Sequence, residues 1–407
     1  MIRRALTNTG WLMGARGVNA VLSLGYLALA TRALGLEGFG KFILAVSFAQ
    51  ALSGLASFQT WQAVVRWGHG RESAGEAVGF ALALDLLTVV AGSAAAALLL
   101  GLAGAWLPVP PALRMEAFWL TVVMLLAVRS TPTGILRLHD KYAWAATADA
   151  VTPVVRLLGA AAAVAFAPTS AAFVIVWAVA EVATAFAYWR FALRLEPLPW
   201  RKISLRKLPR GEPDAWRFVW GTGLSGALLI ASRQVVVLLV GALGGAALAG
   251  IYRVAAQLGE GLLKLAQALL RATYPELVRD PAAARRIAAK IVRIAAITGA
   301  VTLAFGALAG HWVILAIAGR EYLGAYVPML ILAGAAAIEL AGAPLEALLV
   351  ARGRALTNFL LRALPTALAL AALPLAVSRA GAGGAAAAVL IASTLSVCGL
   401  MIANRER

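Results

Sequence analysis

Long, nearly uninterrupted apolar stretches recur along the whole chain, and this feature constrains its fold more than any other. A helix needs roughly 20 mainly apolar residues to cross about 30 Å of hydrocarbon. Of the residues, 62% are hydrophobic and 13% are charged, whereas soluble domains carry about 25% charged residues. Membrane strands would alternate apolar and polar residues over about ten positions, but these stretches are continuous. The sequence therefore predicts an all-α, polytopic membrane protein.

The apolar stretches predict about twelve transmembrane helices. The internal repeat and the polar stripes described below predict that these helices form two six-helix bundles around a central cavity. We expect residues 1–192 to form the first bundle, 193–215 a basic cytoplasmic linker, and 216–407 the second bundle. The predicted spans are 10–31, 41–64, 76–104, 116–136, 146–166, 170–189, 217–241, 246–270, 288–316, 324–350, 356–376 and 384–403.

The distribution of basic residues predicts the orientation of these helices. The net charge is +18, and lysine and arginine concentrate in alternate loops, most densely between residues 190 and 210. Cytoplasmic loops carry such an excess, so we expect both termini in the cytoplasm of a multi-pass protein of a bacterial inner membrane. Topology accounts for the basic excess, and we therefore expect no nucleic-acid partner.

A short motif occurs twice, about half a chain apart, as in transporters with internal repeats. The motif begins with Ala33-Leu34-Gly35 and again with Ala242-Leu243-Gly244. Gly40 and Gly250 follow in the two copies, about 210 residues apart. These motif glycines are expected to act as close-packing points or hinges, with packing favoured.

Polar residues form a stripe on the predicted spans next to each motif. In span 41–64 the residues Ser47, Gln50, Gly54 and Ser57 recur at helical spacing and share one face. The same offset leads to Gln257, Glu260, Lys264 and Gln267 on one face of span 246–270. Arg253 before these residues and Arg271 after them extend that face. Further stripe residues in the first and seventh spans are Arg16, Asn19, Ser23, Tyr26, Ser225, Ser232 and Arg233.

Charges inside a bilayer cost about 2.5–3.5 kcal/mol each on insertion scales, so these faces are expected to line a protein interior or a watery cavity. Two alternatives without a role in substrate binding remain open. Glu260 and Lys264 stand four residues apart and can neutralise each other, and Arg16 can snorkel to the interface. The candidate substrate-binding residues are Arg16, Asn19, Ser23, Ser47, Gln50, Arg233, Arg253, Gln257, Glu260, Lys264 and Gln267.

Three acidic residues within the spans, Asp85, Glu339 and Glu346, are candidates for coupling a transported ion. Each can instead neutralise an arginine of another helix, and for Asp85 and for the lone acid Glu181 that structural role is favoured. Asp149 and Arg156 bracket Pro153, which is typical of a kinked helix with two interface charges.

The sequence carries no recognisable enzyme site. It has no phosphate-binding glycine loop followed by lysine and serine or threonine. Cys398 is the only cysteine, and the three histidines are scattered over loops and span edges. We therefore expect neither catalysis nor a metal, nucleotide or other cofactor.

Several segments resemble the bacterial polysaccharide flippases, the Wzx-type lipopolysaccharide or O-antigen exporters of the multidrug/oligosaccharidyl-lipid/polysaccharide superfamily. The resemblance covers essentially the whole chain, although each motif is loose. It rests on Asn8, Trp11-Leu12, Ala15-Arg16-Gly17-Val18, Ala30-Thr31-Arg32-Ala33-Leu34-Gly35, Gly38-Phe39-Gly40, Leu239, Gly250-Ile251-Tyr252, Ala255-Ala256-Gln257, Tyr274-Pro275-Glu276-Leu277 and Gly319-Arg320-Glu321-Tyr322.

The resemblance implies a cavity walled by spans 1, 2, 7 and 8 and an undecaprenyl-pyrophosphate-linked oligosaccharide as substrate. This substrate would be flipped from the cytoplasmic to the periplasmic leaflet by alternating access. Membrane lipids, and a polymerase or glycosyltransferases of the same pathway, are the implied partners. The family often has an acidic residue where Arg233 and Gln234 stand here, so no coupling-ion role is carried over to this helix.

Two other functions remain open at the level of sequence. A drug or small-molecule antiporter of the same superfamily would need an acidic cavity, which the cation-rich stripes disfavour. A membrane glycosyltransferase or polymerase would need a carboxylate cluster on a sizeable extramembrane loop, and the predicted periplasmic loops are short.

Overall fold

The computed structural model describes the backbone of residues 2–69, 71–277, 284–351 and 354–405. Within these ranges the side chains that are not described are those of residues 2–16, 71–73, 225–226, 228–231, 262–277, 284–291, 294–295, 347–348, 350–351, 355 and 405. Over the described backbone the secondary structure is helical, without strands.

The helices confirm the prediction of an all-α, multi-pass membrane protein. Nine helical stretches among the described residues are long and apolar enough to cross a membrane. The helices are α1 (Ile2–Ala56), α2 (Thr60–Trp67), α3 (Arg71–Leu102), α4 (Arg114–Leu126), α5 (Ser130–Leu138), α6 (Tyr142–Phe166), α7 (Ser170–Ala192), α8 (Lys207–Gly211), α9 (Ala215–Leu277), α10 (Ala284–Ile317), α11 (Tyr326–Ala351) and α12 (Ala355–Arg405). Short 3-10 helices occur at Pro111–Leu113, Trp200–Lys202 and Arg320–Ala325.

Breaks in three long helices explain why fewer stretches than predicted spans are seen. The backbone leaves helical geometry at Gly35 in α1, at Gly245 in α9 and at Ala380–Gly381 in α12. Each break falls between two predicted spans, so each of these helices supplies two segments. Counted this way, the helical segments correspond to the predicted spans along the chain.

The fourth predicted span, 116–136, lies within one candidate membrane span, Pro111–Leu138, but it is not one continuous helix. It divides into α4 and α5, separated at residues 127–129. Pro132 explains the break, since a proline ring inside a helix clashes with the carbonyl four residues earlier. That carbonyl belongs to Val128, and it accepts a hydrogen bond from Trp189 Nε1 at 2.9 Å. The break leaves Arg129 at the start of α5.

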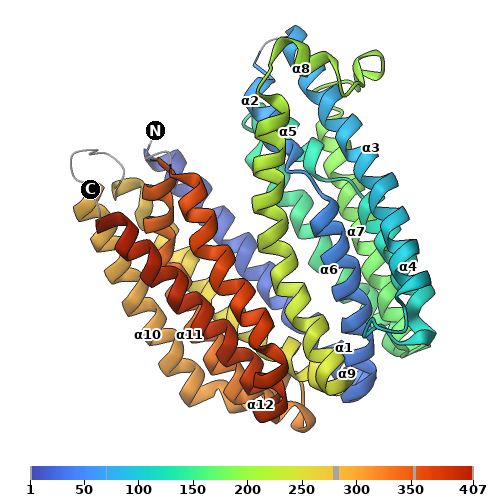
Figure 1. Cartoon of the computed structure of the whole chain (residues 1–407), viewed down its shortest axis with the longest axis vertical. Coiled ribbons are helices and arrows are strands. Elements are labelled where there is room, and N and C mark those ends of the chain that lie inside the picture. The colour runs from blue at the N-terminus through green and yellow to red at the C-terminus, as the bar shows by residue number, and fades with distance from the viewer. Residues whose placement is uncertain (1, 70, 278–283, 352–353, 406–407) are drawn as a thin grey trace. The chain divides into compact units, whose positions relative to one another are not determined.

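The chain forms two compact units, both discontinuous in sequence. The N-terminal unit comprises Gly14–Leu34 and Lys41–Leu238. The C-terminal unit comprises Met1–Met13, Gly35–Gly40 and Leu239–Arg407. Within the C-terminal unit α10, α11 and α12 lie side by side (Figure 1). The division into bundles at 1–192 and 216–407 with a linker at 193–215 stays a prediction.

Aromatic and aliphatic side chains form the core of the N-terminal unit. Phe42 meets Phe173 with ring centroids 6.0 Å apart, and Tyr26 meets Trp177 edge-on at 6.1 Å. The basic segment before α9 also belongs to this core, because Leu208 of α8 is buried against Phe80 and neighbouring residues. That segment is therefore held against α3.

In the C-terminal unit the two copies of the glycine motif cross at very short range. A Cβ atom at Gly40 would lie 1.9 Å from the carbonyl oxygen of Ala246, and one at Gly250 would lie 3.2 Å from that of Leu36. The two contacts are related by the predicted repeat offset. Gly35 also lies in this crossing, where its carbonyl accepts a 2.9 Å hydrogen bond from the Tyr322 hydroxyl. Gly40 and Gly250 are thus close-packing positions.

Candidate functional site

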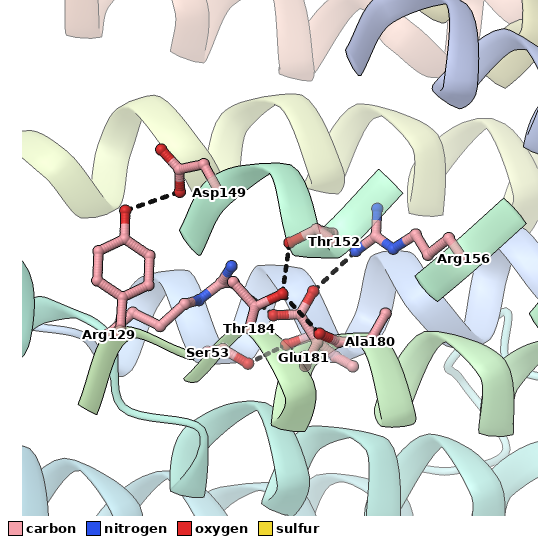
Figure 2. A network of polar contacts seen from close by, with 10 residues as sticks. Ser53, Arg129, Asp149, Thr152, Arg156, Ala180, Glu181 and Thr184 are labelled. Atoms are coloured by element: carbon pink, nitrogen blue, oxygen red, sulfur yellow. Dashed lines mark hydrogen bonds and ion pairs between the residues drawn. The ribbon is translucent and has the colours of Figure 1, made fainter. Parts of the chain in front are cut away.

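A buried carboxylate bridged by two arginines lies inside the N-terminal unit. Glu181 of α7 is only 3% exposed at its side chain. Arg156 of α6 contacts one carboxylate oxygen at 2.7 Å, and Arg129 contacts the other (Figure 2). The Arg156 guanidinium also lies 3.4 Å from the ring centre of Trp177, a cation–π contact. Two cations thus share one anion, and the cluster carries a net positive charge.

The local sequence explains how the arginines reach Glu181. The break between α4 and α5 places Arg129 at the N-terminal side of α5, where its carbonyl accepts from the Thr133 backbone N–H at 3.0 Å. Arg156 stands one turn beyond Pro153 in α6. Thr152 and Thr184 join the same two helices through their hydroxyls at 2.7 Å (Figure 2). The helices α6 and α7 are therefore fastened by polar contacts as well as by apolar packing.

A second buried acid, Asp85 of α3, is bonded to hydroxyl groups rather than to a cation. Its two carboxylate oxygens accept hydrogen bonds from the hydroxyls of Thr60 at 3.0 Å and Thr131 at 2.5 Å. These threonines belong to α2 and α5, so one carboxylate connects three helices. The side chains of all three residues are buried.

A cavity of about 320 Å³ lies beside these groups, entirely within the N-terminal unit. The second segment of α1, helix α3, the break before α5 and residue 234 of α9 contribute to its wall. Phe58 is the aromatic residue on this wall. The polar lining residues are Gln50, Ser53, Ser57, Asp85, Thr88, Arg129, Ser130 and Gln234.

Several side-chain oxygens on this wall can accept a further hydrogen bond. The hydroxyls of Ser53, Ser57 and Thr88 donate to backbone carbonyls of Ala49, Ser53 and Ala56, so only their lone pairs remain available. The side-chain oxygens Oε1 of Gln50 and Gln234 are buried and accept no hydrogen bond in the structure. The Arg129 side chain, 35% exposed, contributes donors and positive charge. The cavity therefore offers buried acceptors for hydroxyl donors, together with the N–H donors and positive charge of Arg129.

The structure brings some of the predicted site residues of the N-terminal unit together and leaves others apart. Gln50 lines the cavity with its stripe neighbours Gly54 and Ser57. Ser47 is buried, 1% exposed, and is not part of the lining. Asn19 and Ser23 are half-buried on α1, where the Ser23 hydroxyl donates to the Asn19 carbonyl at 2.8 Å. Arg233 is exposed.

The remaining predicted substrate-binding residues belong to other parts of the chain. Arg253, Gln257 and Glu260 are half-buried in α9, within the C-terminal unit. The side chains of Arg16, Lys264 and Gln267 lie outside the described residues. A binding centre shared by the stripes of both units stays a prediction.

The other candidate acids have partners in the C-terminal unit. Glu346 forms an ion pair with Arg362 at 2.7 Å and accepts from the Asn358 amide at 3.1 Å. Glu339 accepts a 2.8 Å hydrogen bond from the Ser393 hydroxyl. Glu346 and Glu181 thus neutralise arginines, which is the alternative to an ion-coupling role, whereas Asp85 accepts hydrogen bonds from threonines. A coupling role for Asp85, Glu339 or Glu346 stays a prediction.

Sequence reasoning missed two residues of this site, Arg129 and Gln234. Arg129 falls inside the predicted span 116–136, and a charge within a span is itself a sign of a functional or paired position. Gln234 follows Arg233, which the stripe analysis did select. Neighbours on a helix point about 100° apart, so a one-residue error in a stripe selects the wrong face.

Comparison with known proteins places the chain in a family. Residues 5–279 match the family described as polysaccharide biosynthesis protein. The chain belongs to this family. A relative of the polysaccharide biosynthesis protein is the Inner membrane protein YghQ of Escherichia coli (strain K12), which is 30% identical over 301 residues, covering 70% of this chain and 83% of YghQ.

Solved structures share the fold of this polysaccharide biosynthesis protein. One is an inward-facing multidrug resistance MATE family transporter of the MOP superfamily, with a TM-score of 0.68, 16% identity and coverage of 95% of this chain and 93% of the other. Another is the lipid II flippase MurJ in an inward closed conformation, with a TM-score of 0.68, 12% identity and coverage of 97% and 87%. The chain thus has the fold of MOP-superfamily membrane transporters.

Proposed function

We propose that this protein is a flippase that moves an undecaprenyl-pyrophosphate-linked oligosaccharide from the cytoplasmic to the periplasmic leaflet of a bacterial inner membrane. The observation that carries the proposal is the oxygen-lined cavity, which holds Arg129 inside a unit built from membrane-spanning helices. Membership of the polysaccharide biosynthesis protein family supports surface polysaccharide, such as O-antigen or lipopolysaccharide, as the end product.

The physical task explains why such a cavity is needed. The sugar hydroxyls and phosphates of the substrate cannot cross hydrocarbon without partners, because each unsatisfied polar group there costs several kcal/mol. A polar path replaces those partners while the lipid tail stays in the bilayer. Alternating access of the two units would carry the head group across. An inside-negative potential favours outward movement of an anion by about 2.3 kcal/mol per charge per 100 mV.

Three further features belong to the proposal. Both termini lie in the cytoplasm, as the loop charges favour. Arg16, Arg233, Arg253 and Lys264 attract the pyrophosphate, and the polar stripe residues accommodate sugars. A polymerase or glycosyltransferases of the same pathway supply the substrate and consume the product.

A multidrug antiporter is the nearest alternative, since one protein of similar fold is described as a multidrug resistance transporter. A cationic drug would need an unneutralised carboxylate to attract it. Glu181 and Glu346 already pair with arginines. The cavity wall carries the cation Arg129 and also Asp85, whose two carboxylate oxygens accept hydrogen bonds from the hydroxyls of Thr60 and Thr131. These contacts favour an anionic, hydroxyl-rich cargo over a cationic one.

Leaflet-resolved transport in proteoliposomes tests the proposal. Fluorescent undecaprenyl-pyrophosphate oligosaccharides with several head groups are reconstituted with the purified protein, and the label is quenched from one side over time. We expect the protein to accelerate exchange between leaflets well above that of empty liposomes. Exchange at the rate of empty liposomes with every head group would rule out the proposed function.

A further inference from the structure

The cavity in the N-terminal unit is too small for a whole oligosaccharide. Its volume of about 320 Å³ is at the lower end of the roughly 300–1,000 Å³ typical of small-molecule sites. A single sugar ring with its substituents fits this volume, whereas several linked rings do not. The cavity can therefore select one residue of a larger glycan.

We propose that this cavity is a subsite for one sugar residue that carries an oxyanion, with Gln50 and Gln234 binding ring hydroxyls and Arg129 binding the oxyanion. The inference rests on the proposed function and deepens it, because it names the chemical feature by which the transporter recognises its cargo. The oxyanion is either the carboxylate of an acidic sugar or a phosphate attached to the ring.

The two glutamines carry the hydroxyl part of the argument. Their Oε1 atoms are buried and accept no hydrogen bond in the structure, yet both residues line the cavity. A buried acceptor without a partner costs about 1–3 kcal/mol. Sugar hydroxyls are donors that satisfy both oxygens. The hydroxyls of Ser53 and Ser57 donate to backbone carbonyls, so their lone pairs also favour an incoming O–H over a second acceptor.

Arg129 carries the charge part of the argument. One of its five donors is used by Glu181, whose other oxygen is bound by Arg156. The cluster therefore has one positive charge without an anionic counterpart among its three members. Asp85 lies on the same cavity wall, but both of its carboxylate oxygens accept hydrogen bonds from threonine hydroxyls. The planar guanidinium is held in place by Glu181 and still lines the cavity. Such a preorganised fork binds a carboxylate or phosphate through paired hydrogen bonds.

Saturation-transfer NMR on the whole protein in nanodiscs tests the subsite with four probes. These are glucuronate, glucose 1-phosphate, glucose and inorganic phosphate. We expect at least one of the two anionic sugars to bind about tenfold or more tightly than either glucose or inorganic phosphate, since only the anionic sugars satisfy both kinds of group. Binding of glucuronate alone identifies an acidic sugar residue, and binding of glucose 1-phosphate alone identifies a sugar phosphate.

Substitutions test which residues bind the oxyanion and which bind the sugar hydroxyls. Arg129→Gln is expected to abolish the preference for anionic sugars over glucose. The double variant Gln50→Leu with Gln234→Leu is expected to weaken both anionic sugars and glucose. Arg190→Gln, an exposed arginine at the end of α7, and Gln62→Leu, a half-buried glutamine of α2, lie outside the cavity and serve as matched controls.

The folding of each variant and the transport of the lipid-linked substrate are measured separately from sugar binding. Each variant is first checked for a monodisperse elution profile. If Arg129→Gln aggregates, Arg129→Lys replaces it. This variant keeps the positive charge, so we expect it to lose only part of the preference for anionic sugars over glucose. Absence of selective binding by the wild-type protein, or an unchanged preference in the folded Arg129 and glutamine variants, would overturn the subsite. In either case leaflet exchange of the lipid-linked substrate tells whether the proposed function still stands.

Discussion

A single buried carboxylate, Glu181, connects three parts of the N-terminal unit. It receives Arg129 from the break before α5 and Arg156 from α6, while it belongs itself to α7. Buried ion pairs contribute little net stability when they are complete, but removal of one partner leaves the others uncompensated. Glu181 is therefore expected to matter more for integrity than either arginine alone.

Replacement of Glu181 by glutamine tests this expectation. Two guanidinium groups would then share a neutral amide, and we expect a loss of about 1–3 kcal/mol in stability. The midpoint of thermal unfolding in detergent gives the measurement. Asp149→Asn is the matched control, because Asp149 is exposed and its amide still accepts the 2.8 Å hydrogen bond from Tyr188. A Glu181→Gln midpoint equal to that of the control would contradict the prediction.

Coupling between Glu181 and Arg129 can also be measured. Arg129→Gln and Glu181→Gln remove the two ends of the same contact, so the double variant should lose less stability than the two single losses added together. Strict additivity would show that the contact contributes nothing of its own. Thermal unfolding of the wild type, the two single variants and the double variant gives the four stabilities that this comparison needs.

At the residue level the sequence predicted some contacts and not others. Glu181 within a span implied an arginine partner, because an isolated charge in hydrocarbon is costly. Which arginine it would be depended on the break between α4 and α5, and Pro132 was not used to predict that break. Gln50 was selected from helical spacing, whereas the role of Gln234 depends on how α9 packs, which spacing on one helix does not reveal.

At the scale of the helix, two glycines set the shape of the longest helices. Gly35 has φ 65° and ψ −175°, and Gly245 has φ 81° and ψ 175°. This region of backbone conformation is accessible essentially to glycine alone. In the first copy of the motif the break falls on the motif glycine Gly35, whereas in the second copy it falls on Gly245, one residue after the motif glycine Gly244. The repeat therefore located both breaks to within one residue.

Gly245→Ala isolates the effect of backbone conformation. A Cβ atom at Gly245 would meet no atom within 4 Å, so a clash cannot explain a loss of stability. We expect a cost of about 1–3 kcal/mol from the strained φ alone. Gly261→Ala in the same helix is the control, because it has equal space and no positive φ. Equal unfolding midpoints for the two variants would show that α9 tolerates alanine at its break.

Gly40→Ala tests the helix crossing instead. The added methyl would lie 1.9 Å from the Ala246 carbonyl oxygen, so the backbones must separate. We expect little folded protein, measured by fluorescence-detected gel filtration. Gly17→Ala in the same helix α1 should behave like the wild type, since nothing lies within 4 Å there. A wild-type elution profile for Gly40→Ala would contradict the crossing.

At the scale of the whole molecule, the positive-inside distribution makes a prediction about sidedness. Trp200 and Trp106 are exposed by 72% and 88% in loops that should face the cytoplasm and the periplasm, respectively. In a Cys398→Ser background, Trp106→Cys should react with a membrane-impermeant thiol reagent in intact spheroplasts. Trp200→Cys should react only after the membrane is opened. The reverse pattern would invert the proposed topology.

The hydrogen bond from Tyr322 to the Gly35 carbonyl has a consequence for biogenesis. Its partners are separated by 287 positions, and at roughly 5–20 residues per second the ribosome needs on the order of 15–60 s to pass from one to the other. During that interval the turn at Gly35 must persist without its hydroxyl partner and without the Ala246 backbone beside Gly40. The nascent first hairpin is therefore a natural client for an insertase or a membrane chaperone until the second half of the chain is made.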